Sequence, residues 1–397
     1  MQELKNKIQL LTHQYYPEIV ENRRHLHTHP ELSFLEFKTS DYIASKLKQY
    51  NVPFTKGIVE TGIVALIEGK NPSRKTIALR ADIDALPIKE TNNVDYKSKN
   101  EGVMHACGHD VHTASLLGVA RILNELKNEF EGTVKLIFQP GEEKLPGGAS
   151  LMIKEGVLEN PHVQSVFGQH VYPSMEAGKV GFKKGMYMAS TDEIYITVKG
   201  KGGHAAMVKD YNSPLLIASS ILLELNKVFM QQPSDDTPTV LAFGKIMGDG
   251  ATNVIPDVVT IEGTFRTMNE KWRAKAHLKM KQIAEDTAKQ MGGTCDYNIV
   301  NGYPFLINEE TLTARAVAAA EFYLGKENVE ELPLRMTGED FAFFTQQRPS
   351  CFYRLGTGNK AKGITSGIHT STFNIDESAL QTGPGLMAWL AINELKE

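Results

Sequence analysis

One short segment of the chain concentrates side chains that can bind metals. From His105 to His112 the sequence reads HACGHDVH, which places three histidines, a thiol and a carboxylate in a turn-like stretch before a strongly apolar region. Alternation through Cys107 and His109 would aim both side chains the same way, as two ligands of one metal require. The alternative is a helix N-terminus capped by Asp110 with incidental histidines, and the segment alone leaves both interpretations open.

The adjacent glutamates Glu142 and Glu143 follow the apolar run KLIFQ and a Pro-Gly turn. The run predicts a buried strand, and active-site residues of open α/β sheets gather at the carboxyl ends of strands. Two carboxylates there can divide the work, one binding a metal and the other taking a proton from water. An isolated Glu pair in such a turn is more often a solvated surface feature. Whether this pair has a catalytic role therefore depends on the residues that lie near it.

Further polar residues follow other apolar runs. Asp82 and Asp84 come after TIALR, His170 comes after SVFGQ, and His369 lies in the loop TSGIHTST. Each alone is best explained as a satisfied polar residue at a strand end. Packing explains them poorly as a set, because several strands would deliver Asp, Glu, His or Cys to the same edge of a sheet.

The segment GKNPSRKT, residues 69–76, resembles a phosphate-binding P-loop, but Arg74 stands in place of its second glycine. It also joins two predicted strands, so no helix N-terminus would face a phosphate. We interpret it as a hairpin loop. A second alternative chemistry, Cys107 as a thiol nucleophile, is disfavoured by the potential ligands that crowd it.

The elements that would position these residues follow an α/β pattern. From about Asp192 the order changes to strand, helix, strand, strand, helix, strand, which is the ferredoxin-like βαββαβ unit. We predict an α/β fold in which residues 187–301 form a domain inserted into a main domain of residues 1–186 and 302–397. In the main domain we expect helices from Pro17 and over 37–50 and 111–127, and strands over 62–67, 76–81, 133–138 and 165–169.

The composition excludes several classes of protein. The 397 residues are 41% hydrophobic and 23% charged with a net charge of −4, which is ordinary for a globular protein and makes nucleic acid an unexpected partner. No stretch reaches the roughly 18 uninterrupted apolar residues of a membrane span, and the N-terminus has no signal-peptide pattern. Three cysteines far apart in sequence argue against a disulfide framework. We therefore expect a cytoplasmic protein.

Taken in order, these motifs match a known family. The chain resembles the M20 metallopeptidases, in particular their amidohydrolase branch, which includes hippurate hydrolases, N-acetyl-diaminopimelate deacetylases and plant auxin-conjugate hydrolases. The resemblance covers essentially the whole chain, and its landmarks are RRHLHTHPELSFLE, LRADIDALPI, MHACGHDVHTA, FQPGEE, GQHV, GKGGHAA, NVIPD, EGTFRT, TGEDFAFF and GIHTSTF.

The resemblance implies a metal-dependent exopeptidase-like domain with a mixed sheet, and an inserted lid domain through which the protein forms a homodimer. It implies two divalent metal ions per subunit, with zinc, manganese, cobalt or nickel as candidates. The implied general base is Glu142, and Asp84 resembles the carboxylate that orients a metal-site histidine. The implied metal ligands are Cys107, His109, Glu143, His170 and His369.

In the inserted domain the resemblance implies three further roles. His204 of GKGGHAA resembles a residue that reaches the partner's active site and stabilises the oxyanion. Asn253 and Arg266 match positions that hold the substrate carboxylate, a task that suits the planar guanidinium of arginine.

The implied reaction is hydrolysis of the amide bond of an N-acyl amino acid by activated water. Rivals within the family are a dipeptidase, a carboxypeptidase, or N-acetyl-diaminopimelate deacetylase specifically, because the same site residues serve all of them. A rival of another class is a metal- or ligand-binding protein without catalysis, and the presence of both Glu142 and Glu143 argues against it. A structural zinc module would require closed four-ligand sites.

Overall fold

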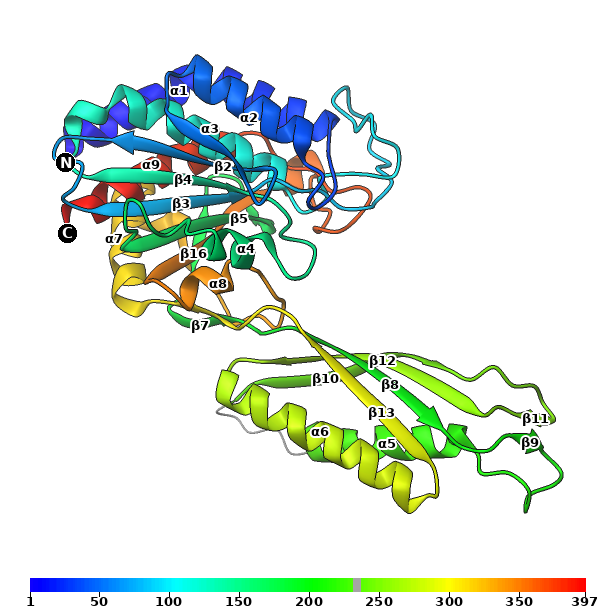
Figure 1. Ribbon diagram of the computed structural model, residues 1–397. Helices are drawn as coiled ribbons and strands as arrows, with labels where there is room; N and C mark the ends of the chain where they lie inside the picture. The colour runs from blue at the N-terminus through cyan, green and yellow to red at the C-terminus, as the bar shows by residue number, and fades with distance from the viewer. Residues whose placement is uncertain (231–236) are drawn as a thin grey trace. The chain divides into compact units, whose positions relative to one another are not determined.

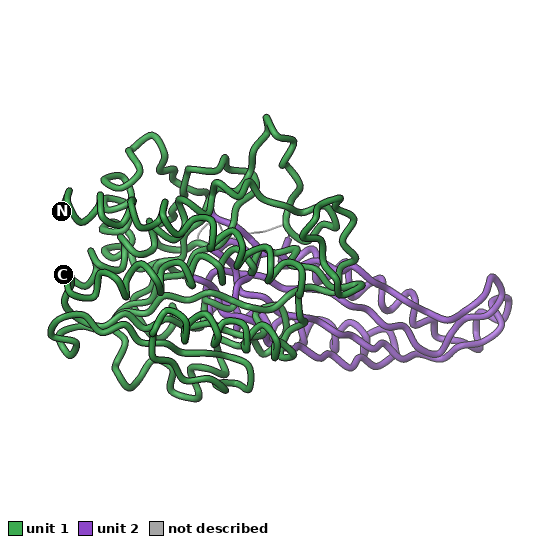
Figure 2. The backbone as a smooth tube through the Cα atoms, turned by 90° about the horizontal axis from the view of Figure 1, so that it is seen from above, with its two compact units in different colours: residues 1–187, 307–333, 340–397 green, residues 188–306, 334–339 purple. Residues whose placement is uncertain are grey.

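The computed structural model describes residues 1–230 and 237–397, and these form two compact units (Figure 1, Figure 2). Unit 1 comprises Met1–Tyr187, Ile307–Pro333 and Asp340–Glu397, and unit 2 comprises Met188–Leu306 and Leu334–Glu339. The short return of the chain into unit 2 at 334–339 has no counterpart in the sequence prediction of a single insertion. Within the described part of the chain, no helix combines the length and the apolar character needed to cross a membrane.

Unit 1 contains an eight-stranded mixed sheet of order β1-β2-β4-β3-β5-β16-β6-β15. The strands of this sheet are β1 (Phe54–Ile58), β2 (Gly62–Glu68), β3 (Thr76–Asp82), β4 (Thr133–Gln139), β5 (Ser165–Glu176), β6 (Val180–Phe182), β15 (Val329–Glu331) and β16 (Ser350–Gly358). The helices are α1 (Gln2–Thr28), α2 (Phe37–Gln49), α3 (His109–Glu125), α4 (Gly148–Lys154), α7 (Glu310–Leu324), α8 (Ala342–Thr345) and α9 (Ala379–Lys396). Two short strands lie where the chain passes between the units, β7 (Gly185–Met188) and β14 (Leu306–Asn308).

Helices cover both faces of this sheet, as a mostly parallel sheet requires. Helices α1, α3 and α9 pack on one another on one side, and α4 and α8 lie on the other side (Figure 1). Helix α3 is buried at nearly every position, because it lies between the sheet and α1. The arrangement agrees with the α/β class that the sequence predicted and with the mixed sheet that the resemblance implied.

The first helix begins at Gln2, so the prediction of a helix start at Pro17 was wrong. Ile8, Tyr15, Ile19 and Leu26 are buried along one stripe of α1, which packs on α3 and α9. Burial of several such side chains, at roughly 1.5–3 kcal/mol each, outweighs the roughly 3 kcal/mol that an internal proline costs a helix.

The interpretation of residues 69–76 as a hairpin loop was also wrong. Strand β4 lies between β2 and β3, antiparallel to the first and parallel to the second, so β2 and β3 are not neighbours. Lys75, the P-loop-like lysine, pairs with Glu394 of α9 at 2.8 Å. Its charge holds the C-terminal helix at the amino end of β3.

The parallel register of the central strands aligns the site. Asp82 at the end of β3 lies opposite Gln139 at the end of β4, and Arg80 lies opposite Gly168 of β5. His170 is therefore level with Asp82. The sequence predicts His170 at a strand end, but β5 continues to Glu176, so this histidine lies within the strand.

Unit 2 is a four-stranded antiparallel sheet of order β10-β12-β8-β13, with α5 and α6 on one face (Figure 1). Strand β8 alternates buried and exposed residues, and the buried ones pack on α5 and α6 to form a separate core. Its elements are β8 (Asp192–Lys199), β9 (Gly203–His204), α5 (Pro214–Phe229), β10 (Thr239–Met247), β11 (Val254–Ile255), β12 (Val258–Thr267), α6 (Glu270–Gln290) and β13 (Thr294–Asn301). This is the ferredoxin-like unit predicted from the sequence.

Candidate metal centre and active site

The turn that enters α3 brings the first two candidate ligands together. Gly108, with φ +86°, precedes His109, the first residue of the helix, and a Cβ added to Gly108 would lie 2.6 Å from the side chain of Val171. Only glycine fits there without strain. Cys107 and His109 therefore converge through a left-handed turn, and not through the extended alternation that the sequence suggested.

Asp110 does not cap the helix, because it faces α1. Its carboxylate accepts a hydrogen bond from Nε of Arg23 at 2.8 Å and lies 2.8 Å from Nδ1 of His27. Burial opposes ionisation, but the charges of Arg23 and His27 outweigh it and hold the pKa of Asp110 well below its usual value. The ion pair fixes the first turn of α3, and with it His109.

Five side chains from four segments of unit 1 converge next to this turn. Sγ of Cys107 lies 3.5 Å from Nε2 of His170 and 3.3 Å from Nε2 of His369. Oε1 of Glu143 lies 3.3 Å from Nε2 of His369 and 3.9 Å from Nε2 of His109. The atoms form two groups of potential ligands that share the thiol, Cys107 with His109 and His170, and Cys107 with Glu143 and His369. The structure thus brings together all five residues that the resemblance implied as ligands.

The two buried imidazoles are oriented by hydrogen bonds at the nitrogen that faces away from the cluster. Nδ1 of His109 lies 2.9 Å from the carbonyl oxygen and 3.1 Å from Oδ1 of Asp84, and Nδ1 of His170 donates to the Val171 carbonyl at 2.8 Å. Each Nε2 is left with its lone pair directed at the cluster. This is the usual support of a histidine that binds a metal.

The electrostatics of the cluster fit divalent cations. Nε2 of His109 and Oε1 of Glu143 are buried and have no hydrogen-bond partner among the described residues. Burial, together with the carboxylates of Glu143 and Glu142, raises the pKa of Cys107 well above its usual value. A thiol in this position would ionise only beside a compensating positive charge, which a metal supplies.

The third histidine of the HACGHDVH segment has a structural role. Nδ1 of His112 lies 2.6 Å from Oδ1 of Asp82, and its Nε2 accepts the backbone N–H of Val171 at 2.9 Å. Both ring nitrogens are used, so His112 has no lone pair for a metal and instead ties β3 to β5. The sequence analysis assigned it no role, although its position one turn after His109 places it beside that ligand.

Glu142 and Glu143 lie in the turn after β4 and differ in direction. Oε2 of Glu142 lies 4.0 Å from Nε2 of His109, and its Oε1 accepts the backbone N–H of Asp340 at 3.4 Å. Glu143 approaches both His109 and His369. The geometry suits one carboxylate as a ligand and the other as a base beside it.

His204 and Asn253 lie together at one end of unit 2. His204 of β9 pairs with Val254 of β11, and the backbone N–H of Ala205 donates to the Asn253 carbonyl at 3.0 Å. Both side chains are exposed, so both are accessible to another molecule.

Arg266 lies far from that end. It is close to the end of β12, which begins at Val258, so about eight residues, or roughly 26 Å at 3.3 Å per residue, separate it from the β11 side. Its guanidinium donates to the Met336 carbonyl at 3.1 Å, and burial lowers its pKa. Within the described part of the chain no carboxylate pairs with Arg266, so the guanidinium is available to an anionic ligand.

Comparison with known proteins decides the family. Residues 78–393 match the pattern of Peptidase family M20/M25/M40. The chain belongs to this family. The N-acetylcysteine deacetylase of Bacillus subtilis is 36% identical over 380 residues, with 95% of this chain and 97% of that protein covered. Thermostable carboxypeptidase 2 of Saccharolobus solfataricus is 37% identical over 377 residues, with 94% of each covered.

Solved structures place the chain in the same family. The YXEP protein of Bacillus subtilis, described as a dinuclear metal binding peptidase from the M20 family, is 33% identical with a TM-score of 0.82. The match covers 96% of this chain and 99% of that chain. The M20 chain is therefore a metal-dependent hydrolase, with amidohydrolases and peptidases among its relatives.

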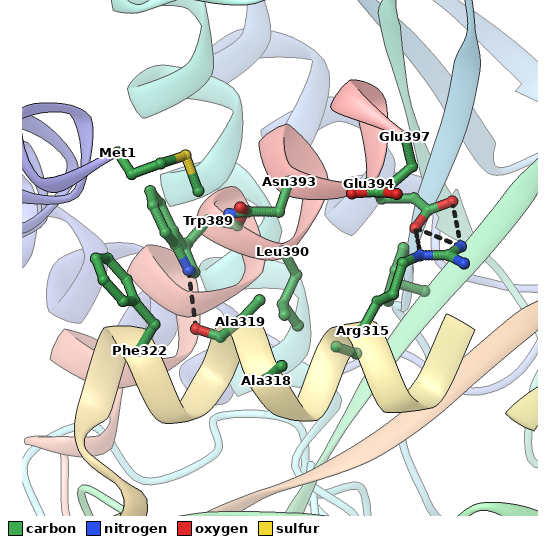
Figure 3. Close-up of a pocket in the computed structure, with 12 residues that line it drawn as sticks. Met1, Arg315, Ala318, Ala319, Phe322, Trp389, Leu390, Asn393, Glu394 and Glu397 are labelled. Carbon is green, nitrogen blue, oxygen red and sulfur yellow. Dashed lines mark hydrogen bonds and ion pairs between the residues drawn. The ribbon is translucent and has the colours of Figure 1, made fainter. Parts of the chain in front are cut away.

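A cavity of about 310 Å³ between α7 and α9 is a separate feature of the M20 chain (Figure 3). Trp389, Phe322 and alanines of α7 line one part of it, and Arg315 pairs with Glu394 in another part at 2.9 Å. Glu394 also binds Lys75. Arg315 and Lys75 thus pair with one carboxylate, and the residues that line the cavity do not include the candidate metal ligands. The metal cluster is therefore the candidate active site.

Proposed function

We propose that this enzyme hydrolyses the amide bond of N-acyl amino acids. The observation that carries the proposal is made in unit 1, where Glu142 lies beside the two groups of candidate metal ligands. In unit 2, Arg266 is a half-buried guanidinium without a carboxylate partner in the described residues, which supports recognition of an acid. Arginine binds a carboxylate through two parallel hydrogen bonds, so the leaving amino acid would be recognised by its own carboxylate, with Asn253 as a second donor.

Cys107, His109, Glu143, His170 and His369 would hold two divalent cations. When bound, the cations supply Lewis acidity, which polarises the amide carbonyl and lowers the pKa of water. Thiolate with imidazole favours zinc, whereas the groups that include carboxylate also suit manganese, cobalt or nickel.

Glu142 supplies the proton transfers of this reaction. Its carboxylate accepts a proton from the attacking water and delivers it to the departing nitrogen, so that the acyl carbon gains a C–O bond as the C–N bond breaks. The Asp340 amide holds one of its oxygens, which leaves the other facing His109. His204 would donate a hydrogen bond to the oxygen that becomes negative as water attacks.

We also propose that the enzyme is a homodimer formed through unit 2. Strand β10 is a sheet edge in the described residues, and the adjacent α5 carries Leu216 and Leu223, which are 64% and 69% exposed and two helical turns apart. Exposed apolar residues beside an open strand edge suit a second copy that pairs edge to edge. A two-fold axis would then bury both surfaces at once.

The distance in unit 2 between Arg266 and the pair His204 and Asn253 supports catalysis across this dimer. His204 and Asn253 lie roughly 26 Å along β12 from Arg266, so one protomer alone cannot present all three to one substrate. In the proposed dimer, His204 and Asn253 of one chain complete a site that contains Arg266 of the other.

The decisive test is a hydrolysis screen with metal-reconstituted enzyme. The substrates are N-acetyl, N-benzoyl and long-chain acyl amino acids, N-acetyl-diaminopimelate and dipeptides. We expect kcat/KM for the best N-acyl amino acid to exceed that for any dipeptide by at least about tenfold. The reverse order would identify a dipeptidase or carboxypeptidase, the alternative that the carboxypeptidase relative favours.

The role of Arg266 is tested with a substrate pair that differs only in the carboxylate. Arg266→Met should lower kcat/KM for the N-acyl amino acid by about 10- to 100-fold, because an ionic hydrogen-bond donor is lost. The corresponding C-terminal amide should be cleaved slowly by both proteins and should be insensitive to the substitution. Equal losses on both substrates would refute carboxylate recognition by Arg266.

We place the enzyme in the cytoplasm and treat unit 2 as an inserted lid and dimerisation domain. All three cysteines are free thiols, which suits a reducing compartment. Fractionation of cells, with the protein detected by antibody, tests the location.

A further inference from the structure

The turn that carries Glu142 and Glu143 is held by its backbone at three points. Gly148 N–H donates to the Gly141 carbonyl at 2.9 Å, which closes the turn on itself. The backbone N–H of Glu143 donates to Asp84 at 3.0 Å. The third point is the backbone N–H of Gly141, which donates to Oε1 of Glu36 at 2.9 Å.

Glu36 is a carboxylate without solvent access, and all of its hydrogen-bond donors in the described residues are neutral. Oε1 accepts the N–H groups of Phe34 at 2.8 Å and Gly141, and Oε2 accepts the hydroxyl of Thr61 at 2.7 Å. Within the described residues no lysine, arginine or histidine forms an ion pair with it. A buried carboxylate with neutral donors alone costs free energy, so stabilising the fold is a poor explanation of Glu36.

The contact between the Glu36 loop and the turn is also tight sterically. Gly141 has φ +61°, and a Cβ built there would lie 2.4 Å from the ring of Phe34. Phe34 itself has φ +66°, an uncommon conformation for a bulky residue. At position 141, only glycine adopts this conformation readily and fits against the Phe34 ring, and Glu36 accepts the backbone N–H groups of both residues. These contacts set the direction in which the chain leaves Gly141 toward Glu142.

We propose that Glu36 is a positioning residue that sets the directions of Glu142 and Glu143 through the amide of Gly141. This rests on the proposed function, in which Glu142 is the base and Glu143 a metal ligand. Neither oxygen of the Glu36 carboxylate needs to touch substrate or metal. Its effect is transmitted through two peptide units, and displacements of about 1 Å at a catalytic group are enough to slow a reaction about 100-fold.

Three substitutions separate geometry from charge. Glu36→Gln keeps an oxygen that can accept both N–H groups, while its amide NH₂ can donate to the Thr61 hydroxyl. Glu36→Asp keeps the charge but withdraws the acceptor by one methylene. Glu36→Ala removes the acceptor. We expect Gln to hold kcat within about threefold of wild type, and Asp and Ala to lower it about 10- to 100-fold, the usual effect of losing a group that supports a metal ligand.

Two readouts distinguish positioning from general destabilisation. The first is the kinetic pattern: KM should change less than kcat in the impaired variants. The second is the affinity for Co²⁺, measured by competition with a chelator in the absence of substrate. This affinity should fall in Glu36→Asp and Glu36→Ala but not in Glu36→Gln. Leu395→Ala is the matched control, since it removes buried apolar volume from α9 near the amino end of β4. It should lower Tm while keeping kcat and Co²⁺ affinity.

The proposal would be overturned if folded Glu36→Asp kept the kcat and the Co²⁺ affinity of wild type. It would also be overturned if Glu36→Gln lost as much kcat and Co²⁺ affinity as Glu36→Asp. If Glu36→Ala fails to fold, the comparison of Glu36→Gln with Glu36→Asp still tests whether Glu36 positions the turn. Failure of the proposed function is a different result, namely wild-type enzyme that cleaves none of the N-acyl amino acids. The Co²⁺ measurement remains informative in that case, because it needs no substrate.

Discussion

The carboxylate of Asp84 accepts the backbone N–H of Glu143 at 3.0 Å. Its other oxygen lies 3.1 Å from Nδ1 of His109. A single buried acid therefore connects two candidate ligands that are 34 positions apart in the sequence, one on α3 and one on the turn after β4. The resemblance implied only that it orients a histidine, whereas the structure adds the link to Glu143.

Asp84→Asn should therefore disturb two candidate ligands, His109 and Glu143. We expect it to weaken metal binding more than a substitution that affected only the contact to His109. The neutral amide supports imidazole less well, and only its oxygen can accept, so His109 and the Glu143 amide compete for it. We expect Co²⁺ or Zn²⁺ affinity to fall about 10- to 100-fold in chelator competition. Ser33→Ala removes only the 2.6 Å hydroxyl contact to Asp84 and should have a smaller effect. Equal affinities in Asp84→Asn and wild type would exclude this role.

The two adjacent glutamates should respond differently to the same substitution. Glu142→Gln removes the base but no proposed ligand, so turnover should fall at least about 100-fold while two metals per chain are retained. Glu143→Gln should lower metal content as well as turnover. Metal analysis of purified protein alongside kcat gives the comparison. Near-normal hydrolysis by Glu142→Gln would show that another group takes the proton.

The sequence predicts that potential metal ligands gather at one edge of the sheet, because parallel strands bring their carboxyl ends together there. The resemblance to the family then implied which five residues are the ligands. Glu143 and His170 belong to motifs that follow apolar runs, and their convergence needs only the strand order. Cys107 precedes an apolar helix instead, and its place in the cluster depends on the turn at Gly108. The ferredoxin-like unit was likewise predictable, since the period of apolar residues changes between helix and strand.

Features that depend on the three-dimensional fit of loops were not predictable. The left-handed turn at Gly108 exists because Val171 leaves no room for a side chain, and nothing in the local sequence reveals that neighbour. Glu36 looks like any surface acid in the sequence, because its burial depends on Thr61 and Gly141. Local propensity favours a helix start at Pro17, but it carries no information on the packing of α1, which extends the helix back to Gln2.

Catalysis across a dimer makes a quantitative prediction for mixed subunits. If His204 acts in the partner's site, a heterodimer of Glu142→Gln and His204→Ala chains contains one intact site out of two. With equal amounts and random exchange, half of the dimers are mixed, so about a quarter of wild-type activity should return. Glu142→Gln mixed with Glu143→Gln is the matched control and should recover nothing, because both residues belong to the same chain's site. No recovery in the first mixture, with exchange verified by tagged subunits, would contradict the role of His204.

Glu36 also predicts an unusual dependence of stability on pH in the metal-free enzyme. Burial, followed by the nearby charge of Asp84, raises the pKa of Glu36 from 4.5 to about 7. The folded state then holds a proton that the unfolded state releases between these two values. Its contribution favours folding below pH 4.5, is lost as the pH rises toward 7, and amounts to about 3 kcal/mol at most.

Glu36→Gln is neutral at every pH and should remove this contribution. Relative to wild type, the Tm of the metal-free Gln variant should therefore be higher at about pH 8 than at about pH 5, as measured by calorimetry in matched buffers. Glu309→Gln provides a control of opposite sign: burial opposes ionisation of Glu309, but hydrogen bonds from the Leu312 and Thr311 amides outweigh it and lower its pKa. That variant should lose Tm relative to wild type as the pH rises above about 4.5, where the ionised carboxylate stabilises the start of α7. A Glu36→Gln difference that is the same at both pH values would mean that the carboxylate is ionised in the folded protein as readily as in the unfolded chain.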